Sequence, residues 1–147
     1  MHEMWKDFLT KQQLSLETPY ESWHFCIEKQ DADELASLVQ KGKKTATSSL
    51  HILYDAENEP LPEVGEYHII TDYDGDPKAI IQTEKVTIVP FRDVGEDFAR
   101  KEGEGDLSLS YWRKIHIDFF MKELTAINRS FTEDMLVVCE EFKVVHT

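Results

Sequence analysis

Two short stretches of the sequence bring together residue types that could do chemistry. In the first, Lys41, Lys43 and Lys44 surround a glycine, and the hydroxyl residues Thr45 and 47–49 follow almost directly. A hydroxyl group becomes a nucleophile when a base removes its proton, and a lysine can be that base where desolvation lowers its pKa. The stretch also fits a purely structural interpretation, because lysine is favoured at helix C-termini and threonine in strands.

The second stretch, residues 101–106, places three carboxylates within five positions. Gly103 and Gly105 between them free the backbone. Such crowding can raise a carboxyl pKa, or it can bind a cation supplied by another part of the fold. The alternative is a solvated acidic loop leading into a helix, with Asp106 or Ser108 as the N-cap. We expect the two stretches, which are opposite in charge, to face one another across a cleft.

The intervening patterns predict the elements that position these stretches. A capping box of Asp31 and Glu34 and an apolar face predict a helix that ends at Gly42, and a strand begins near Thr45. Strands are more numerous than helices and do not form repeated βαβ units, so we predict an α+β fold, a small mixed β-barrel with flanking helices. The predicted helices are 1–18, 31–41, 93–99 and 109–124, and the predicted strands are 23–27, 45–53, 66–70, 78–89 and 135–145.

Length, composition and charge restrict the function. We interpret residues 1–22 as a helical extension packed on the domain and residues 23–147 as one domain. The net charge of −13 opposes binding of nucleic acid by phosphate neutralisation, except locally around the lysines, and it suits a small, nearly neutral ligand. No apolar run matches a membrane span, and the two cysteines form no metal or redox spacing. We therefore expect a cytoplasmic protein without a membrane partner.

Metals and cofactors are not expected. The six histidines show no paired spacing, and the sequence has no P-loop, no dinucleotide fingerprint and no nucleophile elbow. His116 lies on an otherwise apolar helical stripe, which is typical of a hydrogen-bonded core histidine. For Arg113 the pattern leaves two interpretations open, a structural ion pair with the acidic loop and a contact with ligand.

Several segments resemble one protein family in the same order along the chain. Residues 42–47 match the Gly-x-Lys-x-x-Thr signature of the ASCH-domain family, a branch of the PUA-like superfold. The resemblance extends from about Trp23 to the end and points to one bacterial subfamily, through Glu102-Gly103-Glu104-Gly105-Asp106, Tyr111-Trp112-Arg113 and His116. It implies the PUA-like barrel.

The resemblance also implies an activity. Some small ASCH-domain proteins are amidohydrolases that remove acetate from N(4)-acetylcytidine, and their catalytic trio falls here on Lys44, Thr47 and Glu102. Lys44 would be the base and Thr47 the nucleophile, with Glu104 and Asp106 as competitors for the place of Glu102. The residues expected to bind the substrate are Lys43, Thr45, Glu104, Asp106, Tyr111, Trp112 and Arg113.

We therefore predict an amidohydrolase that acts on a modified nucleoside or nucleobase. The alternatives are a non-catalytic RNA-binding module and a ribonuclease, both of which need RNA to bind through the local basic patch. One geometric condition applies, since residues three apart on a strand point to opposite faces. Lys44 must belong to the turn if it is to meet Thr47. The oligomeric state is not predicted.

Overall fold

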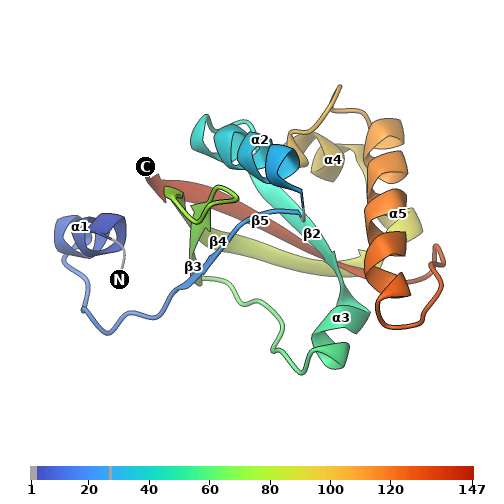
Figure 1. Cartoon of the computed structure of the whole chain (residues 1–147), viewed down its shortest axis with the longest axis horizontal. Coiled ribbons are helices and arrows are strands. Elements are labelled where there is room, and N and C mark those ends of the chain that lie inside the picture. Colours follow the sequence, from blue (N-terminus) through green and yellow to red (C-terminus); the bar gives the residue numbers. More distant parts are fainter. Residues whose placement is uncertain (1–2, 27) are drawn as a thin grey trace.

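The computed structural model describes residues 3–26 and 28–147, and its centre is one mixed sheet (Figure 1). β1 runs parallel to β3, and every other neighbouring pair is antiparallel. Register shifts in the pairing of β4 with β5 curl the sheet into a half-barrel, because a bulge bends and twists its strand. The strand order is β1 (Glu21–Trp23), β3 (Tyr67–Thr71), β4 (Pro77–Pro90), β5 (Leu136–His146) and β2 (Ala46–Leu50).

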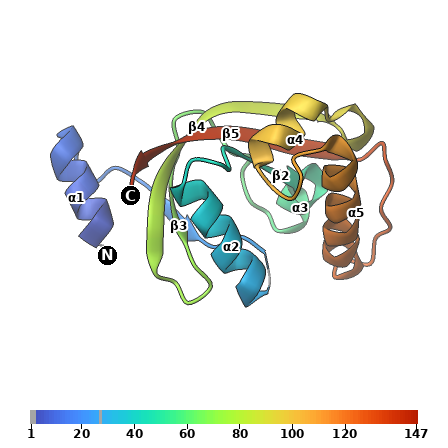
Figure 2. The same ribbon diagram turned by 90° about the horizontal axis from the view of Figure 1, so that it is seen from above.

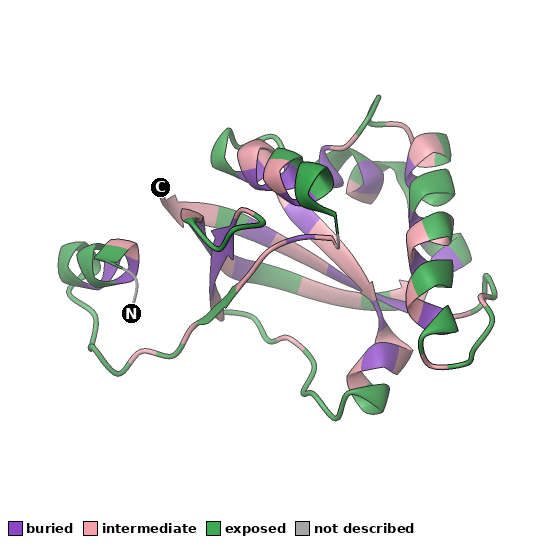
Figure 3. Ribbon diagram, viewed as in Figure 1, coloured by how far each residue is buried: buried purple, intermediate pink, exposed green. Residues whose placement is uncertain are grey.

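Helices flank this sheet, so the predicted α+β fold with a mixed, barrel-like sheet is confirmed. Figure 2 shows α1, α2 and α5 following one another along the long axis of the molecule. Figure 3 shows that the helices are buried on the side that meets the sheet and exposed on the other. The helical segments are α1 (Glu3–Gln12), α2 (Lys29–Gln40), α3 (His51–Ala56), the 3-10 turn η1 (Phe91–Asp93), α4 (Glu96–Glu102) and α5 (Leu109–Thr125).

The core consists of three apolar clusters. The largest joins α5 to η1, β2 and β5, with Trp112 and Phe120 as its central aromatic residues. A second cluster packs α2 against β3, β4 and β5. In the third, Trp5, Phe8 and Leu9 of α1 pack on Ile69 and Ile80. None of the helices among residues 3–26 and 28–147 is both long and apolar enough to cross a membrane.

Near the N-terminus, the sequence predictions need three corrections. The predicted helix over residues 1–18 already ends at Gln12, and its first two residues lie outside the described part of the chain. The predicted strand at 23–27 is replaced by the short β1, because Cys26 has a φ of 56°, which is not strand backbone, and residue 27 lies outside the described part of the chain. α2 begins without the predicted capping box, since its N-cap is Glu28, whose side chain makes no capping hydrogen bond among the described residues.

Two helices, α3 and α4, differ from the sequence prediction. The strand predicted at 45–53 stops at Leu50, and α3 follows, because helical spacing lets Leu50 and Leu53 both reach the core. α4 is longer than the predicted helical turns and ends at Glu102, so this carboxylate belongs to a helix. The N-cap of α5 is Ser108, whose side chain accepts a hydrogen bond from the Tyr111 amide.

Candidate active site

Backbone contacts fix the turn that carries Lys44. Gly42 has a φ of 77°, and the amides of Lys43 and Lys44 then both donate to the Leu38 carbonyl in α2, at 2.9 and 3.1 Å. The same turn lies against the end of α4. A Cβ atom at Gly103 would be 2.2 Å from the Lys43 carbonyl oxygen, so only glycine allows this approach. The two stretches singled out in the sequence therefore meet.

The Lys44 ammonium is buried between three oxygen acceptors. The side chain is 1% exposed, and its Nζ lies 3.0 Å from Glu104 Oε2 and 3.3 Å from Glu102 Oε1. The Glu102 backbone carbonyl is the third acceptor, at 3.4 Å. The ring of Phe25 covers the ammonium, with its centroid 5.1 Å from Nζ. Three acceptors match the three protons of an ammonium, which allows a lysine to be buried while charged.

The Glu102 carboxylate is surrounded by donors. Lys44 donates to Oε1, while Ser48 Oγ at 3.0 Å and the indole Nε1 of Trp112 both donate to Oε2. His116 Nε2 lies 2.9 Å from the same oxygen. These groups come from β2, α5 and the Lys44 turn, so the carboxylate at the end of α4 joins three elements. A carboxylate with this many donors is held as an anion.

The hydrogen bonds of His116 define its protonation. Its Nδ1 is 2.8 Å from the Trp112 carbonyl, which can only accept, so Nδ1 carries a proton. Its Nε2 faces the ionised Glu102 carboxylate and must donate as well. His116 is therefore an imidazolium. The prediction of a hydrogen-bonded core histidine is confirmed, and His116 Nε2 contacts Glu102 of the candidate site.

The pKa directions agree with this assignment of charges. Burial would lower the pKa of Lys44, but Glu102 and Glu104 outweigh burial and raise it. Burial would raise the pKa of Glu102, but Lys44, His116 and the Trp112 indole lower it to about 2. Burial would lower the pKa of His116, but Glu102 raises it. The cluster thus holds two cations against two carboxylates, and its charges balance.

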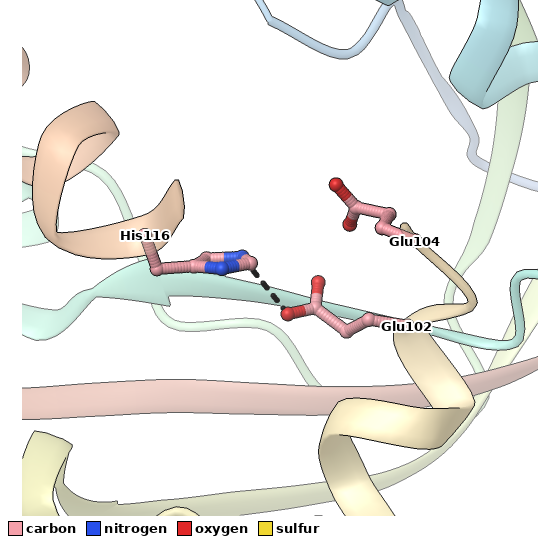
Figure 4. A group of neighbouring side chains, drawn as sticks. All are labelled: Glu102, Glu104 and His116. Carbon is pink, nitrogen blue, oxygen red and sulfur yellow. Dashed lines mark ion pairs between the residues drawn. The ribbon is translucent and has the colours of Figure 1, made fainter. Parts of the chain in front are cut away.

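Glu102, Glu104 and His116 could also be considered as metal ligands. One ligand atom from each lies within 4.8 Å of the others, and the three side chains converge in Figure 4. A metal ion would need the lone pair of His116 Nε2, which a proton occupies, and the space taken by the Lys44 ammonium. The charges of the cluster are already balanced without an ion. The residues therefore fit a metal only if Lys44 withdraws and His116 loses a proton.

A cavity of about 970 Å³ opens beside this cluster. β2 is an edge strand, so the cavity extends around it and is lined by residues from both of its faces. Its lining is strongly acidic, which favours neutral or cationic ligands over phosphates. The charged residues that line it are Glu21, Asp31, Glu34, Glu59, Glu66, Glu102, Glu104, Asp118 and Glu140 against Lys44, Lys122 and the His116 imidazolium.

Thr47 lines the same cavity from the face of β2 opposite to Ser48, because neighbouring strand residues alternate between faces. Among the described residues, its hydroxyl has no hydrogen-bond partner. Its cross-strand neighbour on β5 is Glu140, which also lines the cavity. Burial, with Glu66 and Glu21 nearby, raises the pKa of Glu140 to about 7. Sequence reasoning missed Glu140, although a carboxylate after four apolar residues of a strand was a usable signal.

Cysteine does not compete with Thr47 as a nucleophile. Cys26 lines the cavity, but burial, together with neighbouring carboxylates, raises its pKa to about 11. Burial also raises the pKa of Cys139 to about 12. A thiol is nucleophilic as the thiolate, so both are inert at neutral pH.

The other predicted site residues divide into two groups. Glu104 and Tyr111 line the cavity, and Trp112 is buried behind it with its indole on Glu102. Four do not line it: Lys43, Thr45, Asp106 and Arg113.

Those four have other contacts. Thr45 binds the Lys101 carbonyl through its amide and its hydroxyl, and Asp106 Oδ1 accepts from the Ser108 amide at the start of α5. Lys43 is exposed. Neither interpretation left open for Arg113 is seen, because its guanidinium donates to the Arg92 carbonyl at 3.2 Å and the residue does not line the cavity.

Comparison with known proteins agrees with the fold. An ASCH domain from Lactobacillus crispatus is 37% identical, with a TM-score of 0.89 over 100% of this chain and 97% of that one. A protein from Enterococcus faecalis is 41% identical, with a TM-score of 0.89 over 97% of this chain and 86% of the other. No curated protein matches. The family model of the ASCH domain matches residues 21–146, and the chain belongs to the ASCH domain family.

Proposed function

We propose that this protein hydrolyses the amide bond of an acylated nucleoside such as N(4)-acetylcytidine, with Thr47 as the nucleophile. The observation that supports this best is a free hydroxyl and a buried lysine on one cavity, at the edge of β2. Lys44 lies in the turn before β2, so the condition that it stand outside the strand is met. Both side chains line the cavity, Lys44 on the Ser48 side of β2 and Thr47 on the other, so the substrate carbonyl group would have to lie at the edge of this strand.

The role of Lys44 differs from the one expected from the sequence. A base must lose its proton, and the pKa of Lys44 is raised by two carboxylates. A permanently charged ammonium instead suits the negative oxygen that develops when a nucleophile attacks a carbonyl. We assign Lys44 to the stabilisation of that oxyanion, and Glu102 to holding its ammonium in position.

Glu104 is the residue that the substrate would displace from Lys44. Its side chain is 18% exposed, against 2% for Glu102, so it is the more easily displaced acceptor of Lys44. A substrate carbonyl oxygen that takes the place of Glu104 Oε2 would lie at hydrogen-bond distance from the Lys44 ammonium. Once substrate replaces one carboxylate, the remaining cluster carries a net positive charge beside the reacting oxygen. That charge is what the transition state requires.

The cavity supports a nucleoside rather than a nucleotide or an RNA strand. Its volume lies in the usual range for small ligands, roughly 300–1,000 Å³. Trp23, Phe25, Tyr54 and Tyr111 supply aromatic surface for a base. The acidic residues of the lining repel phosphate groups, which opposes RNA binding and RNA cleavage in this cavity.

Acetate release from N(4)-acetylcytidine and a panel of related acylated nucleosides tests the proposal. We expect the wild type to release acetate and Thr47→Ala to fall to the uncatalysed background. Thr87→Ala is the matched control, because Thr87 is also a half-buried threonine on a strand beside β5 but does not line the cavity. It should keep wild-type activity. A wild type that is inactive on the whole panel, or full activity in Thr47→Ala, would refute the proposal.

A further inference from the structure

The proposed reaction also requires a group that transfers protons, and no residue has been assigned to this role. A threonine hydroxyl attacks an amide only when a base accepts its proton, and the departing nitrogen needs a proton in return. Lys44 is already protonated, and Glu102 accepts from four donors. Glu104 belongs to the cluster on the Ser48 side of β2, whereas Thr47 projects from the other face. The proton carrier must therefore lie elsewhere on the cavity and within reach of Thr47.

The strand register places one carboxylate in that position. Thr47 on β2 lies directly opposite Glu140 on β5, so their side chains project from the same face of the sheet. The Cβ atoms of such a pair are about 4.5–5.5 Å apart, which brings a glutamate carboxylate within reach of a threonine hydroxyl. Both residues line the cavity. No rearrangement of the backbone is needed for them to meet.

We infer that Glu140 is the general acid and base of this site and exchanges a proton with Thr47, an inference that rests on the proposed function. The residues around Glu140 suit that task. Glu21 on β1 and Glu66 before β3 are the carboxylates that act on it, and Tyr54 on α3 lies in the same electrostatic neighbourhood. With burial they raise the pKa of Glu140 to about 7, where a group both gives and takes protons readily.

The reaction then balances in two steps. Glu140 takes the proton of the Thr47 hydroxyl while the oxygen forms a bond to the acyl carbon, and the carbonyl electron pair moves onto the oxygen beside Lys44. The C–N bond breaks as that pair returns, and protonated Glu140 gives its proton to the departing nitrogen. In the second step Glu140 takes a proton from water, hydroxide adds to the acyl-threonine, and the Thr47 oxygen leaves with that proton. The products are the free amine and a carboxylic acid.

The test measures the first-turnover rate at which p-nitrophenyl acetate acetylates Thr47 between pH 5 and 9, with samples quenched in acid before the acyl-threonine hydrolyses and the peptide that contains Thr47 followed by mass spectrometry. We expect the rate in the wild type to rise with a midpoint near pH 7, as Glu140 loses its proton. In Glu140→Gln the rate should fall by roughly 10²–10⁴-fold and the midpoint should disappear.

Glu123→Gln is the matched control. Glu123 lies on α5 and does not line the cavity, yet its pKa is also raised to about 7, by burial and by Glu57. This variant should keep both the rate and the midpoint of the wild type. An unchanged rate and midpoint in Glu140→Gln would overturn the inference, and so would a wild type in which Thr47 is not acetylated. Because this probe contains no nucleoside, its outcome is separate from that of the acetylcytidine assay.

Discussion

Glu102 and Glu140 line one cavity, but their surroundings are opposite. Glu102 is surrounded by donors and a buried ammonium, and its pKa is lowered to about 2. Glu140 is half buried near two other carboxylates, and its pKa is raised to about 7. Glu102 stays ionised at neutral pH, whereas Glu140 changes readily between its protonated and ionised forms. Glu102 therefore provides a constant negative charge, whereas Glu140 can transfer a proton.

This contrast is informative because both residues are glutamates that line the same cavity. Pairs of titratable groups whose pKa values are pushed apart by their environments mark the division of tasks in many active sites. Here the division follows the two faces of the edge strand β2. The Ser48 face meets the balanced cluster of Lys44, Glu102 and His116, and the Thr47 face meets the acidic end of the cavity.

The largest effect is expected from breaking the balanced cluster. Lys44→Met roughly keeps the volume of the side chain but leaves Glu104 without a cation and Glu102 with His116 alone. Removing one partner of a buried ion pair costs roughly 3–5 kcal/mol, so the free energy of unfolding, measured with urea at pH 7, should fall by that amount. Lys101→Met is the matched control, because Lys101 pairs with Glu141 at 2.7 Å but is 49% exposed. It should change stability little, and equal losses in the two variants would contradict the contrast.

The next effect is a pH dependence of stability with opposite signs for the two glutamates. The folded pKa of Glu102 lies below its unfolded value near 4.5, so its stabilisation is present above that pH and is lost as the pH falls towards 2. The folded pKa of Glu140 lies above its unfolded value. Its stabilisation is therefore present below pH 4.5 and is lost as the pH rises through 7.

Urea unfolding between pH 2 and 8 covers both contributions. Glu140→Gln should remove a loss of roughly 3 kcal/mol over this range, since one pKa unit corresponds to about 1.4 kcal/mol. Glu123→Gln should remove a similar loss, because Glu123 has a comparable pKa. The two variants therefore agree in stability and differ in catalysis. A slope between pH 5 and 8 that is as steep in Glu140→Gln as in the wild type would show that Glu140 ionises normally in the folded state.

The sequence allowed the prediction of the fold class and of the meeting between Lys44 and Glu102. Local signals were sufficient there. Gly42 ends a helix, the lysines follow at once, and the acidic loop carries complementary charge. The helix boundaries were less predictable, since α3 forms where tertiary packing of Leu53 overrides strand propensity.

Two properties of the site could not be predicted in this way. The pKa of Lys44 depends on the balance between burial and two carboxylates, and the sequence contains neither distance nor depth. The pairing of Thr47 with Glu140 depends on the register of β2 against β5, which are far apart along the chain. A shift of that register by one residue would turn Glu140 to the other face. Chemistry that arises across strands is visible only once the sheet is known.

The smallest expected effect concerns RNA, and it tests whether the basic turn adds anything to the cavity. Lys41 and Lys43 are exposed beside Gly42, whereas Lys44 is buried and cannot contact a polyanion. With a net charge of −13, we expect only weak binding to generic single-stranded RNA, and steep loss of affinity by about 0.2 M salt. A salt titration of wild type should show this, and Lys41→Gln with Lys43→Gln should abolish the residual binding. Lys6→Gln with Lys11→Gln removes the same charge from α1 and should not. Tight binding that survives 0.2 M salt would instead favour an RNA-binding module, because phosphate contacts from two exposed lysines cannot supply it.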